Sequence, residues 1–184
     1  MSRKMTIGFV LALTGLIFLA GSALAQAPAH KIVGAEKGCK MCHNAEAKGA
    51  QFKIWAASGH AKAYATLATP EAKEVATKLG VADPQKDDKC LSCHTTKGIL
   101  KSEAGPTYAD AEGVGCEGCH GAGSDYKAMN VMKDRAASIA AGMVLPTEAT
   151  CKQCHNENSP TYKPFTFAEA LKVVAHPNPA KKAG

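Results

Sequence analysis

The motif Cys-x-x-Cys-His occurs four times in this chain and uses all eight of its cysteines. In chain order the four motifs contribute Cys39, Cys42 and His43; Cys90, Cys93 and His94; Cys116, Cys119 and His120; and Cys151, Cys154 and His155. At this spacing two thiols can form thioether bonds to the vinyl groups of one haem, and the adjacent imidazole can bind its iron. The sequence therefore predicts four covalently attached haem c groups. We number motifs and haems first to fourth along the chain.

Zinc and disulfides are the alternatives to haem. Paired Cys-x-x-Cys motifs build four-thiolate zinc sites, and eight cysteines suffice for two of them. Cysteines also form disulfide frameworks in exported proteins. Neither alternative explains why a histidine follows every pair in a chain that has only seven histidines. We therefore favour haem c.

Residues 1–25 have the pattern of a secretory signal peptide. Two basic residues precede an apolar run over residues 7–20, and Ala23-Leu24-Ala25 fits a cleavage site. The run is shorter than the roughly 20 residues that span a bilayer, so we expect cleavage and no stable membrane anchor afterwards. The expected mature protein, residues 26–184, is one tetrahaem cytochrome domain exported to the periplasm.

Composition limits the core and the partners. Only 5% of the residues are aromatic, and four haems leave roughly 40 residues for each, so haem is expected to form the core of a mainly α fold with long irregular loops. The formal charge of +6 falls to +4 when the two basic residues of the signal peptide are removed. Four oxidised haems with ionised propionates bring it to about zero. We therefore expect redox proteins as electron donor and acceptor, and no nucleic acid.

Helix signals are local and unevenly spread. The expected helices cover residues 58–67, 70–79, 125–141 and 167–175. Thr69, Ser124 and Thr166 are their clearest N-caps, and Glu169 completes a capping box with Thr166. The glycine-rich stretch between the second and third motifs predicts a loop, and residues 27–38 predict an extended lead. No alternating apolar pattern is long enough to predict a substantial sheet.

The number of histidines limits the axial ligands. Four haems with two protein ligands each require eight, and the motifs leave only His30, His60 and His176 as spare imidazoles. At least one haem must therefore have methionine, another weak ligand, water or an open face opposite its motif histidine. We expect His60 and His176 to bind iron. His30 lies in a loose segment, where it either binds iron or faces solvent.

The order of these features resembles the tetrahaem cytochrome c-554 family. The most specific segments are His60-Ala61-Lys62-Ala63 and the block GVGCEGCHGAG over residues 113–123. The likeness covers nearly all of the expected mature chain. It implies a mostly helical fold with haems in stacked pairs, electron transfer as the function, and one high-spin haem with an open distal face. By motif order the open haem is the second, on Cys90, Cys93 and His94.

The chain departs from the family pattern after the third motif. There the family places a further distal histidine, for the first haem, whereas residues 126–132 contain none. Met129 or Met132 can ligate instead, which would raise the potential of that haem, or both can simply pack on porphyrin faces. His30 can also replace the missing ligand from the N-terminal side.

The predicted haems and ligands are compatible with two functions. An electron carrier is favoured, because six-coordinate iron cannot bind a substrate without losing a ligand. A small-molecule reductase, acting on nitric oxide, nitrite or hydroxylamine at one open haem, is the alternative. A reductase also needs distal proton donors, and Asp87, Asp88 and Glu103 are more simply explained as solvated loop charges. The chain is therefore expected to be an electron-transfer protein rather than an enzyme. A filament subunit is a third class, because haem composition leaves the oligomeric state open.

Overall fold

The computed structural model describes residues 30–179. Within them the chain is mainly helical, and its only extended pairing is an isolated parallel bridge between Ile32 and Ala104. The mainly α fold expected from the sequence is confirmed. The expected signal peptide, residues 1–25, lies outside the described residues. In the part of the chain that is described, no helix has the length and apolar character needed to cross a membrane.

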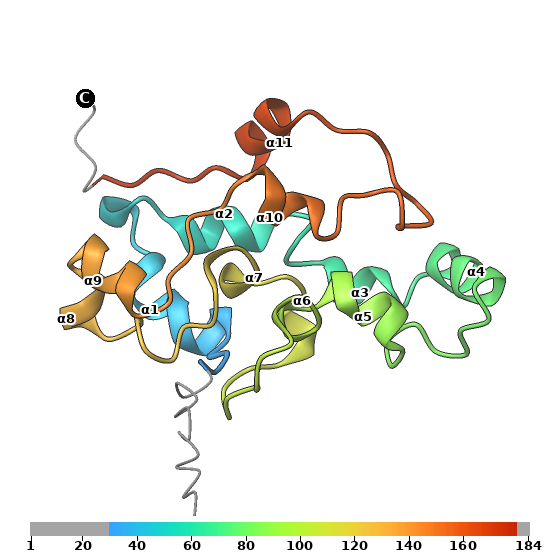
Figure 1. Ribbon diagram of the computed structural model, residues 1–184, viewed down its shortest axis with the longest axis horizontal. Helices are drawn as coiled ribbons and strands as arrows, with labels where there is room; N and C mark the ends of the chain where they lie inside the picture. The colour runs from blue at the N-terminus through green and yellow to red at the C-terminus, as the bar shows by residue number, and fades with distance from the viewer. Residues whose placement is uncertain (1–29, 180–184) are drawn as a thin grey trace, which may run out of the picture.

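The helices are short and joined by long irregular segments (Figure 1). In chain order they are the π-helix η1 (Ala35–Cys39), α1 (Lys40–His43), the 3-10 helix η2 (Glu46–Lys48), α2 (Gln51–Ala57), α3 (Ala63–Thr66), α4 (Pro70–Lys78), α5 (Asp88–His94), α6 (Thr96–Leu100), the 3-10 helix η3 (Asp110–Glu112), α7 (Cys116–His120), α8 (Met129–Met132), α9 (Arg135–Ala140), α10 (Glu148–Lys152) and α11 (Phe167–Val174).

Each Cys-x-x-Cys-His motif lies on or beside one of these helices. The first motif spans the end of η1 and α1, the second lies on α5, the third forms α7, and the fourth begins in α10. Helix η1 contacts both α1 and α7, and α6 contacts both α7 and α5. In Figure 1, α1 lies with α8 and α9 toward one end of the molecule, whereas α3, α4 and α5 lie toward the other. A series of helix contacts thus connects the first, third and second motifs.

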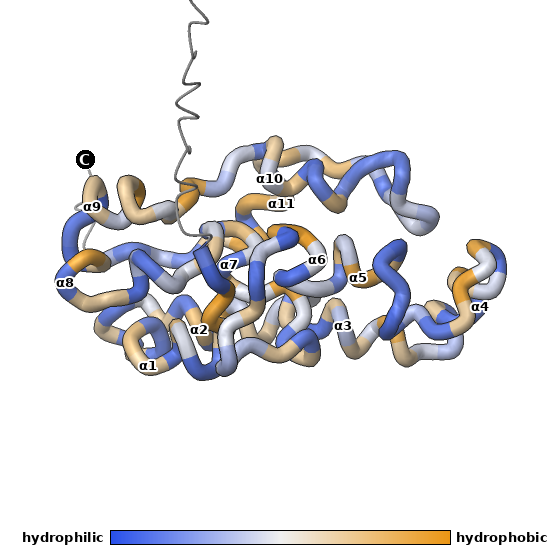
Figure 2. Tube along the Cα trace, turned by 60° about the horizontal axis from the view of Figure 1, so that its bottom comes forward, coloured by the Kyte–Doolittle hydropathy of each residue, from blue (hydrophilic) through white to orange (hydrophobic). Residues whose placement is uncertain are grey.

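The polypeptide itself buries few large apolar side chains. The larger ones that are buried are Ile32, Val33, Phe52, Leu67, Val81, Val114 and Tyr126. Others stay exposed, among them Met41, Met129, Ile139, Leu145 and Val173. Figure 2 shows apolar segments spread over α4, α6 and α8 rather than gathered at one centre. This distribution is what we expect of a fold in which haem supplies much of the core.

Helix α4 follows its sequence signals closely. The Thr69 side chain accepts a hydrogen bond from the Ala72 amide at 3.2 Å, and the helix ends at Lys78, shortly before Gly80. The helix expected over residues 58–67 is wrong in its bounds. Ser58 ends α2, which the sequence analysis did not anticipate, and helical structure resumes only at Ala63.

The expected cap at Ser124 is wrong, because a distant segment takes its hydrogen bonds. The Ser124 hydroxyl accepts from the Lys31 amide at 2.9 Å, and the Ser124 amide donates to the Lys31 carbonyl at 3.1 Å. The long helix expected after it is replaced by α8 and α9, and Asp134 caps α9. Helix α11 begins after Thr166 as expected, but without the capping box, since Glu169 pairs with Lys172 instead.

Two stretches expected to lack helix contain short ones. The segment between the second and third motifs holds η3 and α6, and Thr95 caps α6 by accepting from the Gly98 amide at 3.0 Å. Gly98 packs so closely on α5 that a Cβ there would collide with the Leu91 carbonyl. The expected extended lead turns into η1 from Ala35 onward. Helix α6 has a local N-cap in Thr95 that the sequence analysis overlooked.

Candidate haem-binding sites

None of the eight cysteines is paired in a disulfide. In a c-type cytochrome the Sγ atoms of such motifs are the thioether sulfurs that hold the haem edges, so their positions give the predicted attachment points. Within residues 30–179 no three histidine, cysteine or acidic side chains gather as a self-sufficient metal site. The positions of the sulfurs relative to one another therefore indicate how the predicted haem sites are arranged.

The attachment sulfurs of the first and third motifs lie together. Hydrogen bonding to Cys116 is the largest cause that raises the pKa of Cys39, and the same bond lowers the pKa of Cys116. The two motif histidines are close as well, since His43 contributes to lowering the pKa of His120. These contacts agree with the packing of η1 against α7. One edge of the first haem site therefore adjoins one edge of the third.

The remaining two motifs continue this series. Burial raises the pKa of Cys119, and Cys151 of the fourth motif adds to the rise. Burial also raises the pKa of Cys154, with Cys93 of the second motif as the next cause. These electrostatic neighbours link the third motif to the fourth and the fourth to the second. No motif is isolated from the rest.

The third motif has a second imidazole beside its own. The rings of His120 and His176 have centroids 6.0 Å apart with an interplanar angle of 47°. His120 Nδ1 lies 3.1 Å from the Val144 carbonyl oxygen, which leaves Nε2 for another partner. Burial lowers the pKa of both histidines and so favours the neutral imidazole that binds metal.

The fourth motif has a similar partner. The His60 and His155 rings have centroids 6.1 Å apart and are nearly perpendicular at 83°. His60 is held through its backbone, whose carbonyl accepts from the Val114 amide at 2.9 Å, while the Trp55 indole donates to the Val114 carbonyl at 2.8 Å. Burial lowers the pKa of His60, and His155 lowers it further.

Both ring separations fit a haem with two histidine ligands. An imidazole nitrogen binds a transition metal at about 2 Å. Two imidazoles on opposite sides of one iron therefore have centroids roughly 6 Å apart. The residues present thus suit bis-histidine haem at the third and fourth motifs. The ligand assignment itself stays a prediction.

The first and second motifs lack such a pair. All seven histidines lie within the described residues, and neither His43 nor His94 makes a ring contact with another of them there. His94 Nδ1 lies 2.8 Å from the Ala63 carbonyl oxygen, which again leaves Nε2 free. The structure therefore brings two of the three spare imidazoles to motif histidines and leaves His30 apart.

His30 and the two methionines are the remaining candidate ligands. His30 Nδ1 is 2.9 Å from Asp125 Oδ2. Met129 and Met132 begin and end α8, and Met129 is 65% exposed. Their role as ligands stays a prediction.

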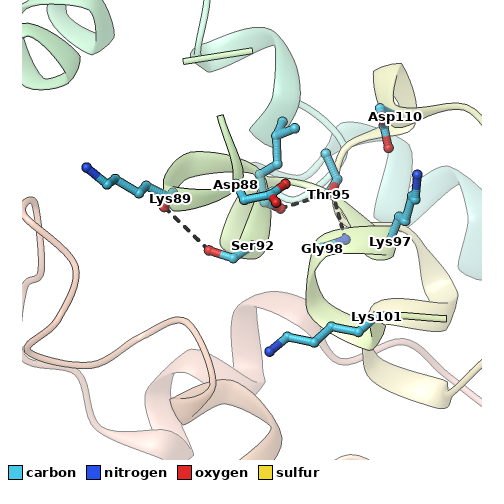
Figure 3. Close-up of a pocket in the computed structure, with 9 residues that line it drawn as sticks. Asp88, Lys89, Ser92, Thr95, Lys97, Gly98, Lys101 and Asp110 are labelled. Carbon is cyan, nitrogen blue, oxygen red and sulfur yellow. Dashed lines mark hydrogen bonds between the residues drawn. The ribbon is translucent and has the colours of Figure 1, made fainter. Parts of the chain in front are cut away.

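A pocket of about 540 Å³ lies beside the second motif, between α5 and α6 (Figure 3). Its lining includes Asp88, Leu91, Ser92 and Thr95, which recur at helical spacing. Cys90, Cys93 and His94 lie on the opposite face of α5, so the pocket is not the seat of the second haem. Lysines and aspartates share its rim, namely Lys89, Lys97, Lys101, Asp88 and Asp110. This mixed charge indicates no particular anion or cation.

The sequence analysis missed the role of Glu117, which lies between the cysteines of the third motif. Its side chain is fully buried and accepts hydrogen bonds from three backbone amides, those of Val33 at 2.9 Å, Gly34 at 2.7 Å and Gly123 at 2.6 Å. This carboxylate ties the segment before the first motif to the third. An acidic residue at this position is absent from the other three motifs, and that difference was the available signal.

Comparisons with known proteins agree with this picture. Residues 38–121, which include the first three motifs, match the family described as cytochrome c554 and c-prime. Cytochrome c-554 of Nitrosomonas europaea is 32% identical over 158 residues, a match that covers 71% of this chain. The match spans 63% of the length of that relative. No solved structure matches the chain.

The motif order, the helical fold and these two matches agree with one another. The chain belongs to the cytochrome c-554 family of c-type cytochromes, which carry covalently bound haem c.

Proposed function

We propose that this chain is a periplasmic tetrahaem cytochrome that carries electrons between redox proteins. One observation carries the proposal: the segments that bear the motifs adjoin one another. Helix η1 contacts α7, α7 contacts α6 and α6 contacts α5, and the cysteines of the fourth motif are electrostatic neighbours of Cys119 and Cys93. Electrons can move from one haem to the next only where the haems lie close together. A continuous series is what conduction through the molecule requires.

The chain's own residues would bind and orient the cofactors. Haem c supplies reversible one-electron chemistry when bound. Eight cysteines hold it, and His43, His94, His120 and His155 are the proximal ligands. His176 and His60 complete the third and fourth sites, and their pKa values, lowered by burial, keep them neutral and able to ligate. Backbone carbonyls at Nδ1 of His94 and His120 fix the ring orientations.

His30 is the remaining imidazole, and we assign it to the first haem. The segment around it lies near Gly142 and the third motif, at the end of the molecule that holds α1. His94 lies at the other end, beside Ala63 of α3. The second haem is then the one without a second histidine. This agrees with the open haem that the family resemblance implies.

The export of the protein is part of the proposal. It rests on the signal-peptide pattern of residues 1–25 and on the need of covalent haem c for an assembly pathway outside the cytoplasm. Cleavage after Ala25 gives a holoprotein whose mass equals residues 26–184 plus four haems. Mass spectrometry of the protein isolated from the periplasm measures both properties at once.

A reductase acting on nitric oxide, nitrite or hydroxylamine is the second candidate. The lack of an imidazole partner for His94 favours it, because it leaves one coordination position for a small ligand. The pocket near the second motif gives it no support, since it lies on the other face of α5. Electron carriage therefore remains the better supported function.

Stopped-flow kinetics of the tetrahaem holoprotein separates the two. We expect the reduced protein to pass electrons rapidly to a ferric redox protein, and to bind nitric oxide without turning it over. Slow exchange with every redox protein tried, together with many cycles of nitric oxide or hydroxylamine consumption under a chemical reductant, would overturn the carrier proposal. A mass with fewer than four haems would overturn the tetrahaem assignment.

A further inference from the structure

We propose that Asp125 positions His30 as the distal ligand of the first haem, a carboxylate–imidazole pair that sets both the ring orientation and the potential at that site. The inference rests on the proposed function in one respect, the ligand role of His30. Asp125 lies immediately after Ser124, whose expected role was to cap a helix. The structure instead uses this stretch to hold the segment that carries His30.

His30 is held by a carboxylate and by hydrogen bonds between its own segment and a distant one. Asp125 Oδ2 lies 2.9 Å from His30 Nδ1. Backbone and side-chain bonds between Lys31 and Ser124 align the two segments, with the Lys31 amide 2.9 Å from the Ser124 hydroxyl. The Ser124 hydroxyl donates to Asp125 Oδ1 at 2.6 Å, which leaves Oδ2 to face His30, and an aspartate is a carboxylate at neutral pH. Asp125 therefore accepts from a protonated Nδ1 and leaves Nε2 as the metal-binding nitrogen.

Gly142 lies against one face of the His30 ring. A Cβ built at Gly142 would lie 2.9 Å from Nε2, 3.0 Å from Cε1 and 3.2 Å from Cδ2 of His30. Three nearly equal distances put that position over the ring face, not in line with the Nε2 lone pair. Gly142 has a φ of +97° and can approach the ring because it has no side chain. One edge of the imidazole is thus bonded and one face is covered, while the side chain remains 43% exposed.

Contacts around Gly142 place His30 near the first and third motifs. Gly142 also abuts Gly121, since a Cβ on Gly121 would lie 2.8 Å from the Gly142 carbonyl oxygen. Gly121 directly follows His120, which is close enough to His43 for the two to interact electrostatically. His30 is therefore on the side of the first and third motifs. The His176 ring contacts that of His120, whereas His43 makes no ring contact with another histidine within the described residues, so we assign His30 to the first motif.

The chemistry of the pair makes a specific claim. A carboxylate bonded to Nδ1 makes the imidazole a stronger electron donor and stabilises ferric over ferrous iron. His94 and His120 have only neutral carbonyls at the same nitrogen. The first haem should therefore have a lower potential than its ligands alone would give, and the potential should rise when the charge of Asp125 is removed.

The test compares variants of the tetrahaem holoprotein by electron paramagnetic resonance, redox titration and carbon monoxide binding. H30A identifies the haem concerned: it should add one high-spin ferric haem and one carbon monoxide site. D125N keeps an acceptor oxygen without the charge. It should keep that haem low-spin, raise its potential, and let carbon monoxide displace His30 at about tenfold lower concentration. D125A should add a high-spin fraction, and D125E should restore the parent behaviour.

E103Q is the matched control. Glu103 pairs with Lys31 at 2.9 Å, next to His30, but does not touch the imidazole. It is similarly exposed, so E103Q should leave the potential and the carbon monoxide affinity unchanged. An equal shift in E103Q would mean that loss of anchoring, not the carboxylate on His30, is responsible, and would overturn the inference.

Two further outcomes separate the role of Asp125 from the ligand role of His30. If H30A creates the high-spin haem but D125N and D125A match the parent protein in potential and carbon monoxide binding, the role of Asp125 is overturned and His30 remains the ligand. If H30A changes nothing, both the ligand assignment and the role of Asp125 are wrong.

Discussion

The first and third motifs are held by the polypeptide, whereas the fourth lies in a segment with almost no core of its own. Around Glu117 the structure buries Ile32, Ala35 and Val114 together with the carboxylate. We call this the Glu117 junction. From residue 144 to residue 179 not one residue is buried. The contrast teaches that the same motif can be placed in two ways, by a packed protein framework or by the haem and its axial ligands.

The largest expected effect comes from removing the fourth attachment. Replacing both Cys151 and Cys154 with alanine takes away the haem that organises residues 144–179. Limited proteolysis with mass spectrometry should show cleavage in that segment at least about tenfold faster, while the Glu117 junction stays protected. Q153A, in the same motif but with no attachment role, is the control. Equal acceleration of cleavage in both regions would contradict the comparison.

The next largest effect concerns the junction itself. Glu117→Ala leaves the amides of Val33, Gly34 and Gly123 without their acceptor. Unsatisfied buried groups cost about 1–3 kcal/mol each, so the free energy of unfolding should fall by about 3 kcal/mol or more. Denaturant unfolding of the holoprotein measures it. Glu157→Ala, an exposed acid near the fourth motif, should change it by less than about 0.5 kcal/mol. Similar losses in the two variants would mean that the junction is not a special anchor.

His176 links the exposed segment to the third motif. His176→Ala should convert one low-spin haem to a high-spin one and speed cleavage after residue 167, but less than loss of the fourth haem does. Electron paramagnetic resonance and the same proteolysis assay report the two effects separately. Lys172→Ala, on the adjacent helix α11, should do neither. An unchanged spectrum would show that the 6.0 Å ring contact with His120 is incidental.

The smallest effect is a pH dependence at the edge of the junction. Burial raises the pKa of Glu112 above its ordinary 4.5, against hydrogen bonds from the Ala35 and Glu36 amides. The folded state therefore binds this proton more tightly than the unfolded state. Its contribution to stability is complete below pH 4.5 and is lost as the pH rises through the folded-state pKa.

Glu112→Gln should therefore flatten the decline of the unfolding free energy between pH 4 and 7. Because the carboxylate is half-exposed, the change should be about 1 kcal/mol or less. Denaturant unfolding at several pH values measures it. A steeper decline in the variant would mean that its amide bonds outweigh burial.

The helices that the sequence predicted depend on local contacts, whereas the features that it missed depend on contacts between distant segments or on an unusual backbone conformation. Helix α4 was predicted because Thr69 and Pro70 are adjacent and act locally. Ser124 carries an equally good local signal, yet it bonds Lys31, which is distant in sequence. Helix α2 begins after Ala50 in a left-handed conformation, which no residue preference indicates.

In the candidate sites, too, the sequence predicted the local features and missed the long-range ones. The cysteines and motif histidines can be named from spacing alone, because attachment depends on neighbours two or three residues apart. Which spare histidine approaches which motif depends on chain paths of tens of residues, as the separation of His60 from His155 illustrates. The role of Asp125 depends on a contact across 95 positions.

The central claim is that seven histidines complete three haems and leave the second one open. Titration of the fully reduced holoprotein with carbon monoxide tests it most directly, with the haem count taken from the mass of the same sample. We predict one carbon monoxide bound for every four haems, and loss of that site alone when a ligand is supplied opposite His94. Binding of none, or of two or more per protein, would contradict the account.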